Sequence, residues 1–466
     1  MSTAHRPVEI TLDDPNTRTN RDKRRTIFGI GAGNAMEWFD WNIYATFAAF
    51  FAGQFFNNED KVSALLSTLA VFAVGFAARP LGGFVFGWVA DRHGRKSSMA
   101  GTIALAAGGS LAIGLSPTYG QIGIWASVIL LVARLGQGLA HGGELPSAQT
   151  YIAEVAPAAR RGLWSSLIYF SGTCGVIAGT LIGATLSGIL TEDQMYSYGW
   201  RVPFILGGIF GLYSLVMRLR MKETAVFEEG AREADEVQES RWSVIRRNPK
   251  LLFQVIGMTI GGTVAYYVWG IAAPAYAISV RGMDAEGALW AGVGANLVFL
   301  ATLPLAGMLS DRIGRKPMML IMVVGMAAVT FPLNAMVGSS PWSLFTAMSI
   351  ALVLLACWTG VAPAAFAEIF PTRIRTVGLA VPYSIAVAAF GGTAPYLQTW
   401  FADQGNMGGF LWYGIALLAV SAITVLTLPE TKGADLRIST VTRSVGRDRR
   451  SSSTSARRSC KRPFQR

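Results

Sequence analysis

The chain has 466 residues, of which 52% are hydrophobic and 15% are charged, and its formal net charge is +12. A mean hydropathy of +0.40 is too high for water-soluble domains of this length, so much of the surface must face lipid. The three cysteines, Cys174, Cys357 and Cys460, have neither the spacing of a disulfide framework nor that of a metal site. We therefore expect an all-α membrane protein that uses no cofactor.

Twelve apolar segments of helix length follow a polar, basic N-terminal tail at 1–25. The first six lie near 26–52, 63–90, 97–115, 122–153, 163–190 and 199–220. After a charged linker at 221–250, six more lie near 251–279, 288–309, 318–337, 342–367, 377–400 and 409–428. We predict two six-helix bundles, 26–220 and 251–428, and a basic tail at 429–466 with the composition of a disordered segment.

The placement of the positive charge predicts the orientation of the chain. Between and beyond these segments, 35 of the 40 Lys and Arg residues fall on one side, whereas Lys61, Arg201 and Arg281 fall on the other. Loops rich in Lys and Arg stay in the cytoplasm, and no signal-peptide pattern precedes the first segment. We expect a multi-pass protein of the cell membrane with both termini in the cytoplasm and no nucleic-acid partner.

Two features occur once in each half of the chain. The hairpin Gly87–Lys96 returns at Gly307–Lys316 with Gly, Asp, Arg, Gly, Arg and Lys in the same six positions. A glutamate followed by an arginine seven residues later occurs at Glu154 and again at Glu368. One copy of such a basic hairpin could serve orientation alone, but the duplication predicts two parallel halves around a central cavity with alternating access.

The repeated residues are predicted to form a latch that closes the cytoplasmic side. Its aspartates would accept hydrogen bonds from the backbone amides at helix N-termini or form ion pairs with arginines. The latch residues are Gly87, Asp91, Arg92, Gly94, Arg95, Glu154, Arg161, Gly307, Asp311, Arg312, Gly314, Arg315, Glu368 and Arg375.

Four charged residues lie deep within the predicted membrane helices of the first half. At about 1.5 Å per residue, Glu37 and Asp40 lie about 18 and 22 Å from Arg25, and Arg79 and Arg134 lie about 18–20 Å from their helix ends. Each such charge costs about 2.5–3.5 kcal/mol unless it is paired or faces a wet cavity.

These charges have a structural and a functional interpretation. They could form an ion-pair network that only holds the helices together. Alternatively, Arg79 and Arg134 attract an anionic substrate, and Glu37 and Asp40 exchange protons. The second half carries no charge within its segments, so it would add aromatic and hydroxyl contacts, with Tyr266 and Tyr267 among the candidates.

The two hairpins, with the stretch from Arg134 to Gly138, resemble the major facilitator superfamily. Glu37-Trp-Phe-Asp40, the glycine-rich stretch 75–83 and Gly142-Gly143-Glu144 resemble the metabolite:proton symporters. The stretches 261–267 and 390–395 look like the α-ketoglutarate (dicarboxylate) permease branch. This resemblance implies import of carboxylates or zwitterions together with protons.

We expect a secondary transporter, driven by the proton gradient and monomeric, that imports a small carboxylate such as α-ketoglutarate. Alternatives are an importer of a zwitterionic osmolyte, proline or betaine, or of another organic acid such as citrate or shikimate. An enzyme is not expected, because no nucleophile–base pair, metal spacing or phosphate loop occurs in the sequence. An exporter of apolar compounds is disfavoured by the four charges at mid-depth.

Overall fold

The computed structural model describes residues 20–57, 60–93, 95–142, 144–220, 249–370, 375–434 and 436. All elements of these residues are helices, as the composition predicts. The predicted linker and basic tail lie almost entirely outside the described residues.

The first half of the chain forms eleven helical elements. They are α1 (Asn20–Phe55), α2 (Lys61–His93), α3 (Arg95–Leu115), α4 (Tyr119–Ile122), α5 (Ile124–Ala140), α6 (Glu144–Val155), the single turn η2 (Ala158–Arg160), α7 (Arg161–Ile189), α8 (Glu192–Gln194) with the π-helical turn η3 (Met195–Gly199), and α9 (Arg201–Arg220).

The second half repeats this pattern of long helices and short breaks. Its elements are α12 (Pro249–Ala265), the π-helix η4 (Tyr266–Ala272), α13 (Ala273–Arg281), α14 (Ala285–Ile313), α15 (Arg315–Met336), α16 (Pro341–Thr359), α17 (Ala362–Ile369), α18 (Arg375–Ala386), the π-helix η6 (Val387–Gly391), α19 (Ala394–Asp403) and α20 (Met407–Thr427).

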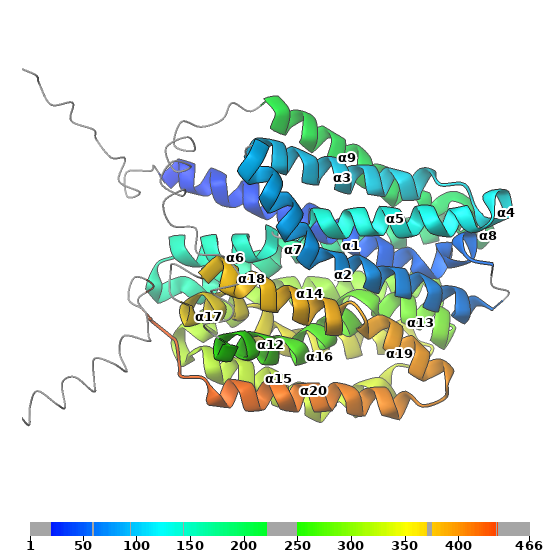
Figure 1. Ribbon diagram of the computed structural model, residues 1–466. Coiled ribbons are helices and arrows are strands. Elements are labelled where there is room, and N and C mark those ends of the chain that lie inside the picture. The colour runs from blue at the N-terminus through cyan, green and yellow to red at the C-terminus, as the bar shows by residue number, and fades with distance from the viewer. Residues whose placement is uncertain are drawn as a thin grey trace, which may run out of the picture.

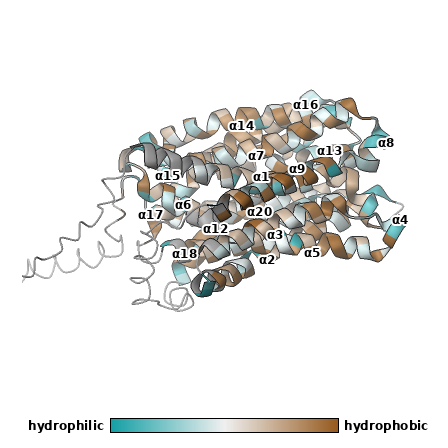
Figure 2. Cartoon of the chain, turned by 90° about the horizontal axis from the view of Figure 1, so that it is seen from above, coloured by the Kyte–Doolittle hydropathy of each residue, from teal (hydrophilic) through white to brown (hydrophobic). Residues whose placement is uncertain are grey.

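Nine helical stretches of the described residues are long and apolar enough to cross a bilayer, and α5 is a shorter apolar helix. Apolar residues cover the middle of the helices, and hydrophilic residues gather at the ends, for example at α4 and α8 (Figure 2). The chain is therefore a multi-pass membrane protein. The count of twelve crossings stays a prediction.

The two halves lie against each other along the length of their helices (Figure 1). The helices α7 and α14 form the most extensive contact between them, and α1 meets α13 while α2 meets α19. The helix α1 begins and α20 ends at the same end of the molecule, near α6, α17 and α18 (Figure 1). We call this the hairpin end, because the hairpins at 91–96 and 311–316 lie there.

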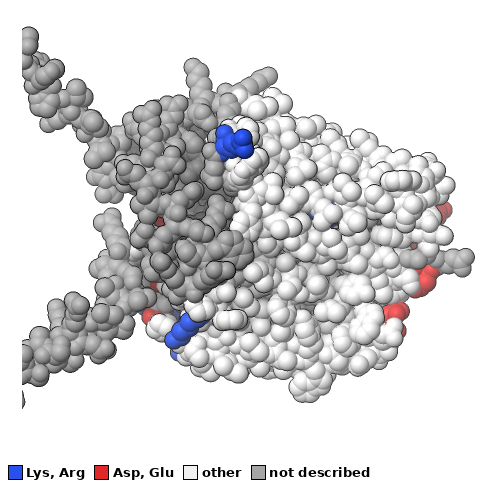
Figure 3. Space-filling view, in the orientation of Figure 1, with Lys and Arg blue, Asp and Glu red and all other residues white. Residues whose placement is uncertain are grey.

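Charged residues gather at the two ends of the visible face (Figure 3). Lys and Arg show near the hairpin end together with some acidic atoms, acidic residues show at the opposite end, and the broad surface between the ends is largely uncharged. This is the surface that a protein embedded in a bilayer needs, because the hydrocarbon core solvates no exposed charge.

Glycines bring α5 and α6 close to α2 in the first half. A Cβ atom on Gly138 would overlap the carbonyl oxygen of Gly75, and one on Gly142 would overlap the carbonyl oxygen of Arg79. Small residues allow such close backbone approach between membrane helices, where no hydrophobic effect drives association. The close approach sets the position of Arg79.

Two π-helical turns of the second half face the first half. The turn η4 carries Tyr266 and Tyr267, and the turn η6 ends at Gly391. A Cβ atom on Gly391 would lie 2.8 Å from the Tyr267 ring, and one on Gly392 would lie 2.8 Å from Phe76 of α2. The glycine pair therefore lets η6 approach both the tyrosines and the first half, at a position where π-helical turns often mark functional sites.

Candidate functional site

A buried ion pair lies at the interface between the halves. Arg79 Nη2 of α2 lies 3.7 Å from Glu37 Oε1 of α1, and both side chains are less than one-tenth exposed. The Arg79 guanidinium also contacts the Trp41 and Phe76 rings, with Cζ 4.1 and 4.3 Å from their centroids. Its Nε atom has no hydrogen-bond partner among the described residues, so part of the guanidinium fork is available to a ligand.

Arg134 lies deeper inside the first half. It is fully buried, and its Cζ atom lies 4.1 Å from the centroids of both the Trp41 and the Tyr44 rings. Its Nη1 atom donates a 2.8 Å hydrogen bond to Gln137 Oε1 one turn along α5. These contacts all come from the first half. Arg134 therefore lies inside the first half, on the side of Trp41 that faces away from the second half.

A chain of hydrogen bonds joins Arg134 to Asp40. Gln137, which accepts from Arg134, donates through Nε2 to Ser110 Oγ at 2.8 Å. Ser110 of α3 donates in turn to Asp40 Oδ1 of α1 at 3.1 Å. This series of hydrogen bonds therefore joins Asp40 and Arg134, which the sequence analysis placed at similar depth in the membrane.

The two carboxylates of α1 therefore have different partners. Glu37 turns to Arg79 and the interface, whereas Asp40 turns to Ser110 inside the first half. The two residues are three apart and lie on the same side of α1. Positions i and i+3 of a helix nevertheless point about 60° apart, which suffices to place the side chains against different neighbouring helices.

Aromatic residues from both halves surround the ion pair. The Trp38 ring of α1 lies 5.3 Å from Tyr266 and 6.4 Å from Tyr267, and the Tyr267 ring lies 5.1 Å from Phe76. Both predicted tyrosines are buried in this cluster. The sequence prediction that the second half offers aromatic groups to the charges of the first half agrees with this arrangement.

A pair of tyrosine hydroxyl groups crosses the interface next to this cluster. Tyr169 of α7 and Tyr383 of α18 have their hydroxyl oxygens 3.2 Å apart. Trp38 Nε1 is buried without a hydrogen-bond partner in the described part of the chain, and Gln149 of α6 interacts with the Tyr383 hydroxyl. Buried polar groups normally have partners, so the Trp38 N–H group is a further candidate to contact a ligand. Nothing in the sequence singled out Gln149, because a single amide in an apolar segment has no recognisable spacing.

The hairpin end holds a reciprocal set of ion pairs between the halves. Arg161 Nη1 of the first half lies 2.9 Å from Glu368 Oε1 of the second, and Arg375 of the second half pairs with Glu154 of the first. Each arginine also donates through Nε to a backbone carbonyl eight residues earlier, Ala153 O or Ala367 O. The duplicated Glu-to-Arg spacing thus builds the same structure twice.

Asp311 joins the halves through the start of α7. Its Oδ1 atom accepts from the Gly162 amide at 2.8 Å, and its Oδ2 atom accepts from the Leu163 amide at 3.0 Å. Arg315 holds the same carboxylate at 2.8 Å and reaches Glu368 at 3.2 Å. The carboxylate therefore compensates the positive end of the α7 dipole and also pairs with an arginine, so both alternatives that the sequence left open are present.

The remaining latch residues divide into three groups. Gly307 packs against the backbone of Gly162, while Arg92 and Arg312 are exposed. Arg92 and Arg312 therefore differ from the buried arginines Arg161, Arg315 and Arg375 of the latch. The side chains of Asp91 and Arg95 and the whole of Gly94 lie outside the described residues, and Gly87 is described only as part of α2.

Glu430 is a latch residue that the sequence did not single out. It accepts hydrogen bonds from the amides of Arg315 at 2.8 Å and Lys316 at 3.0 Å, and thereby caps α15. Burial of the carboxyl group opposes its charge, but the backbone N–H donors outweigh burial and lower the pKa of Glu430. The repeated Glu-Thr pair at 223–224 and 430–431 was the available signal.

Gly314 makes this cap sterically feasible. Its φ angle is +109°, a conformation that residues with a Cβ atom rarely adopt, and a Cβ atom there would overlap the Glu430 carboxylate. The glycine of the hairpin motif is therefore required by the backbone rather than by a ligand.

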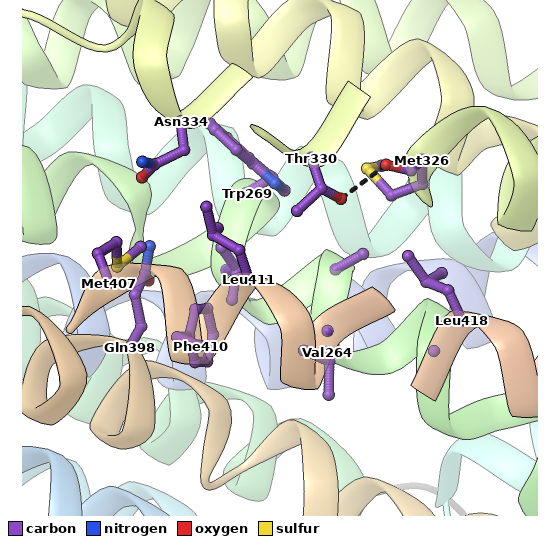
Figure 4. A pocket seen from close by; sticks show the side chains of 14 residues that line it. Val264, Trp269, Met326, Thr330, Asn334, Gln398, Met407, Phe410, Leu411 and Leu418 are labelled. Atoms are coloured by element: carbon purple, nitrogen blue, oxygen red, sulfur yellow. Dashed lines mark hydrogen bonds between the residues drawn. The ribbon is translucent and has the colours of Figure 1, made fainter. Parts of the chain in front are cut away.

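A separate pocket lies within the second half, with about 470 Å³ of empty volume including the space at its open mouth (Figure 4). Its lining is mainly apolar, with Trp269, Thr330, Asn334 and Gln398 as the polar contributors. No charged residue and none of the predicted site residues lines it. It is therefore distinct from the interface that holds Glu37 and Arg79.

Comparison with known proteins agrees with this architecture. The family model described as "Sugar (and other) transporter" matches residues 26–441. The chain belongs to this family of the major facilitator superfamily. The α-ketoglutarate permease of Escherichia coli (strain K12) is 35% identical over 92% of this chain and all of the relative. The predicted resemblance to this permease is confirmed.

Two further proteins show the breadth of the family. The proline/betaine transporter of Escherichia coli (strain K12) is 31% identical over 92% of this chain and 88% of the relative. The structure of the proton:xylose symporter XylE bound to 6-bromo-6-deoxy-D-glucose superposes with a TM-score of 0.69 at 19% identity, covering 90% of this chain and 98% of that chain. The chain is thus a secondary transporter by family, and its fold is that of a major facilitator.

Proposed function

We propose that this transporter imports a small carboxylate, a dicarboxylate such as α-ketoglutarate, together with protons. The observation that carries the proposal is the Glu37–Arg79 pair at the interface of the halves, with Arg79 Nε unpartnered among the described residues. An arginine that is always charged, buried and incompletely hydrogen-bonded is suited to bind a carboxylate through its planar fork.

Arg79 would take one carboxylate of the substrate, and the aromatic cluster would enclose the carbon chain. Trp38 supplies a buried donor that lacks a partner among the described residues, and Tyr266 and Tyr267 line the other side. Arg134, which the sequence analysis paired with the substrate, is in this proposal the counter-charge of Asp40.

Protons would couple through the two carboxylates of α1 in different ways. A substrate carboxylate on Arg79 competes directly with Glu37, so protonation of Glu37 favours substrate binding at Arg79. Asp40 does not compete with the substrate for Arg79. Its protonation instead affects Arg134 through the hydrogen bonds of Ser110 and Gln137. The hydrogen-bonded chain thus transmits the charge of Asp40 to the aromatic residues that Arg79 and Arg134 share.

The membrane arrangement belongs to the same proposal. The positive charge of the hairpin end favours placing that end, with both termini, in the cytoplasm. Helices that meet at both ends of the interface would then represent an occluded state of a twelve-helix monomer. Transport requires the ion pairs of the hairpin end to separate so that the substrate can leave.

The test is uptake of labelled α-ketoglutarate into right-side-out vesicles at inside-alkaline pH, with betaine and proline in parallel. We expect accumulation of the dicarboxylate that an uncoupler abolishes. In Asp40→Asn, exchange of internal for external substrate should persist while uphill accumulation is lost. Full uphill uptake in this variant would contradict the coupling role of Asp40.

Import of proline or betaine is the second candidate, since a relative named for these compounds is 31% identical and a zwitterion also presents a carboxylate. A dicarboxylate offers a second negative charge that betaine lacks. Accumulation of betaine or proline instead of α-ketoglutarate would keep the mechanism and replace the substrate. Absence of uptake of all three would overturn both substrate proposals.

A further inference from the structure

A groove opens on the outer surface of the first half, away from the interface between the halves. It is formed by α1, α7 and α9, and its empty volume is about 1000 Å³ including the open mouth. Phe210 and Tyr213 on α9 and Cys174 on α7 are exposed there. Since these residues lie in the middle of membrane helices, the mouth of the groove faces the lipid acyl chains.

The groove is apolar apart from one charged residue. Asp40 lies in its lining, and the rest of the wall comes from small and apolar residues, Tyr213, Ser214 and Cys174. An acyl chain in the groove would leave this carboxylate against hydrocarbon, which is unfavourable for an acid at mid-membrane. A positively charged occupant would remove this cost.

Aromatic residues strengthen the preference for a cation. Phe39, Phe210 and Tyr213 line the same groove as Asp40. The faces of aromatic rings attract ammonium groups, and sites for organic ammonium ions combine such rings with a carboxylate. No Lys, Arg or His lines the groove in the described part of the chain, so nothing in its wall competes for Asp40.

Arg134 does not line the groove. It is linked to Asp40 by hydrogen bonds through Gln137 and Ser110, and Ser110 occupies the Oδ1 side of the carboxylate. On α9, Gly207 packs closely against Asp40, since an added Cβ atom there would lie only 3.0 Å from Oδ1.

The geometry points to a binding site in this groove for a lipophilic organic ammonium, whose charged nitrogen contacts Asp40 and whose alkyl tail lies along α7 and α9. Such a ligand enters from the bilayer and not through the interface that holds Arg79. The site would bind this class of compound whichever substrate the protein transports. Where Asp40 couples proton movement, as proposed above, the ligand inhibits transport without competing with the substrate.

Cys174 provides a direct reporter, because its exposed thiol lies in the groove lining. We would replace Cys357 and Cys460 with Ser, reconstitute the full chain in lipid nanodiscs, and measure the rate of Cys174 alkylation by N-ethylmaleimide. The probes are dodecyltrimethylammonium and, as a neutral match of equal tail length, dodecanol. We expect the cation to slow alkylation by about tenfold at a concentration where dodecanol has little effect.

Two variants separate the charge from the shape of the groove. Asp40→Asn should remove the difference between the cation and the alcohol, and Ala178→Phe, which fills an exposed lining position, should weaken both. The reactivity of Cys357 in a Cys174→Ser, Cys460→Ser background controls for general effects on the bilayer. Equal protection by the two probes, or full protection by the cation in Asp40→Asn, would overturn the proposal.

The readout does not depend on transport. Absence of α-ketoglutarate uptake combined with cation-selective protection would refute the proposed substrate and keep the groove site. Uptake that dodecyltrimethylammonium does not inhibit, despite protection of Cys174, would keep the site and refute the inhibitory consequence.

Discussion

The hairpin end and the membrane interior use the duplication of the chain in opposite ways. At the hairpin end the two halves contribute equivalent residues, so Arg161 with Glu368 mirrors Arg375 with Glu154. In the interior the charges belong to the first half, where Glu37, Asp40, Arg79 and Arg134 lie, and the second half presents aromatic rings.

This difference follows from what each region has to do. A closure between two rigid halves needs matching contacts on both, and a pseudo-twofold repeat supplies them without further specification. Recognition of an asymmetric substrate and coupling to protons need different groups on the two sides of one site. The duplicated sequence therefore stays similar where the chain closes and diverges where we propose that it binds.

The latch is nevertheless not perfectly symmetric, and its asymmetry gives the largest expected effect. The Glu368 side chain is fully buried and holds Arg161, Arg315 and the Thr431 hydroxyl, whereas the Glu154 side chain is 39% exposed. Glu368→Gln would leave Arg161 without its anion and Arg315 with Asp311 alone, and should destabilise the closed hairpin end by about 3–5 kcal/mol. Glu154→Gln should cost about 0–1 kcal/mol.

Labelling of a cysteine introduced at Ala367, which is fully buried on α17, would measure this opening. In a background without native cysteines, a membrane-impermeant thiol reagent should label Glu368→Gln faster than Glu154→Gln by a factor of about 100 or more. Equal labelling of the two variants would show that the latch is symmetric in energy as well as in sequence.

The interior is tested by exchanging each arginine for lysine. Arg79→Lys keeps the positive charge but loses the planar fork, so we expect the KM for the carboxylate to rise by about tenfold or more. Arg134→Lys should mainly lower uphill accumulation, because Arg134 is hydrogen-bonded toward Asp40 and not toward the interface. A larger KM effect for Arg134→Lys than for Arg79→Lys would reverse the roles assigned here.

In the membrane interior, the two halves of the chain are in close steric contact at Gly392. Its added methyl group in Gly392→Ala would lie 2.8 Å from Phe76 of the other half, and such overpacking should destabilise the occluded state by about 1–3 kcal/mol. Thermal unfolding in detergent would measure the loss, and the double variant Gly392→Ala, Phe76→Leu should recover part of it. Additive losses in the double variant would show that the two residues do not limit the approach of the halves.

Much of this comparison could be predicted from the sequence. The repeated hairpin and the repeated Glu-to-Arg spacing predicted the latch, because identical residues at identical spacing fold alike. Mid-helix position predicted that Glu37, Asp40, Arg79 and Arg134 would lie deep in the membrane helices; Glu37, Arg79 and Arg134 are buried, and Asp40 is partly exposed. Apolar length predicted membrane spans, and nine helical stretches of the described residues have that length.

Which side chains meet could not be predicted from the sequence in the same way. The separation of Glu37 from Asp40 depends on the rotation of α1 against α2 and α3, which the sequence of one helix does not determine. Ser110, Gln149 and Tyr383 have no distinctive spacing, and their roles depend on contacts between helices that are distant in sequence. The cap of α15 by Glu430 joins residues more than 100 positions apart.

The smallest expected effect concerns Glu430, which the second half uses to hold its own hairpin. Because the folded state lowers the pKa of this carboxyl group, its contribution to stability is present above the unfolded pKa of about 4.3 and is lost as pH falls through the lowered folded value. Glu430→Gln should therefore be slightly less stable than the parent chain at pH 7, and the difference between their unfolding temperatures should shrink below about pH 4.

A pH series of unfolding temperatures for the two proteins in detergent would measure this difference, with Asp403→Asn as a control at an exposed acid on the opposite end. A difference that grows toward low pH would mean that the cap acts through its shape and not through its charge. In that case Gly314, and not the carboxylate, would be the residue that fixes the second hairpin against α15, and Gly314→Ala would be the more damaging substitution.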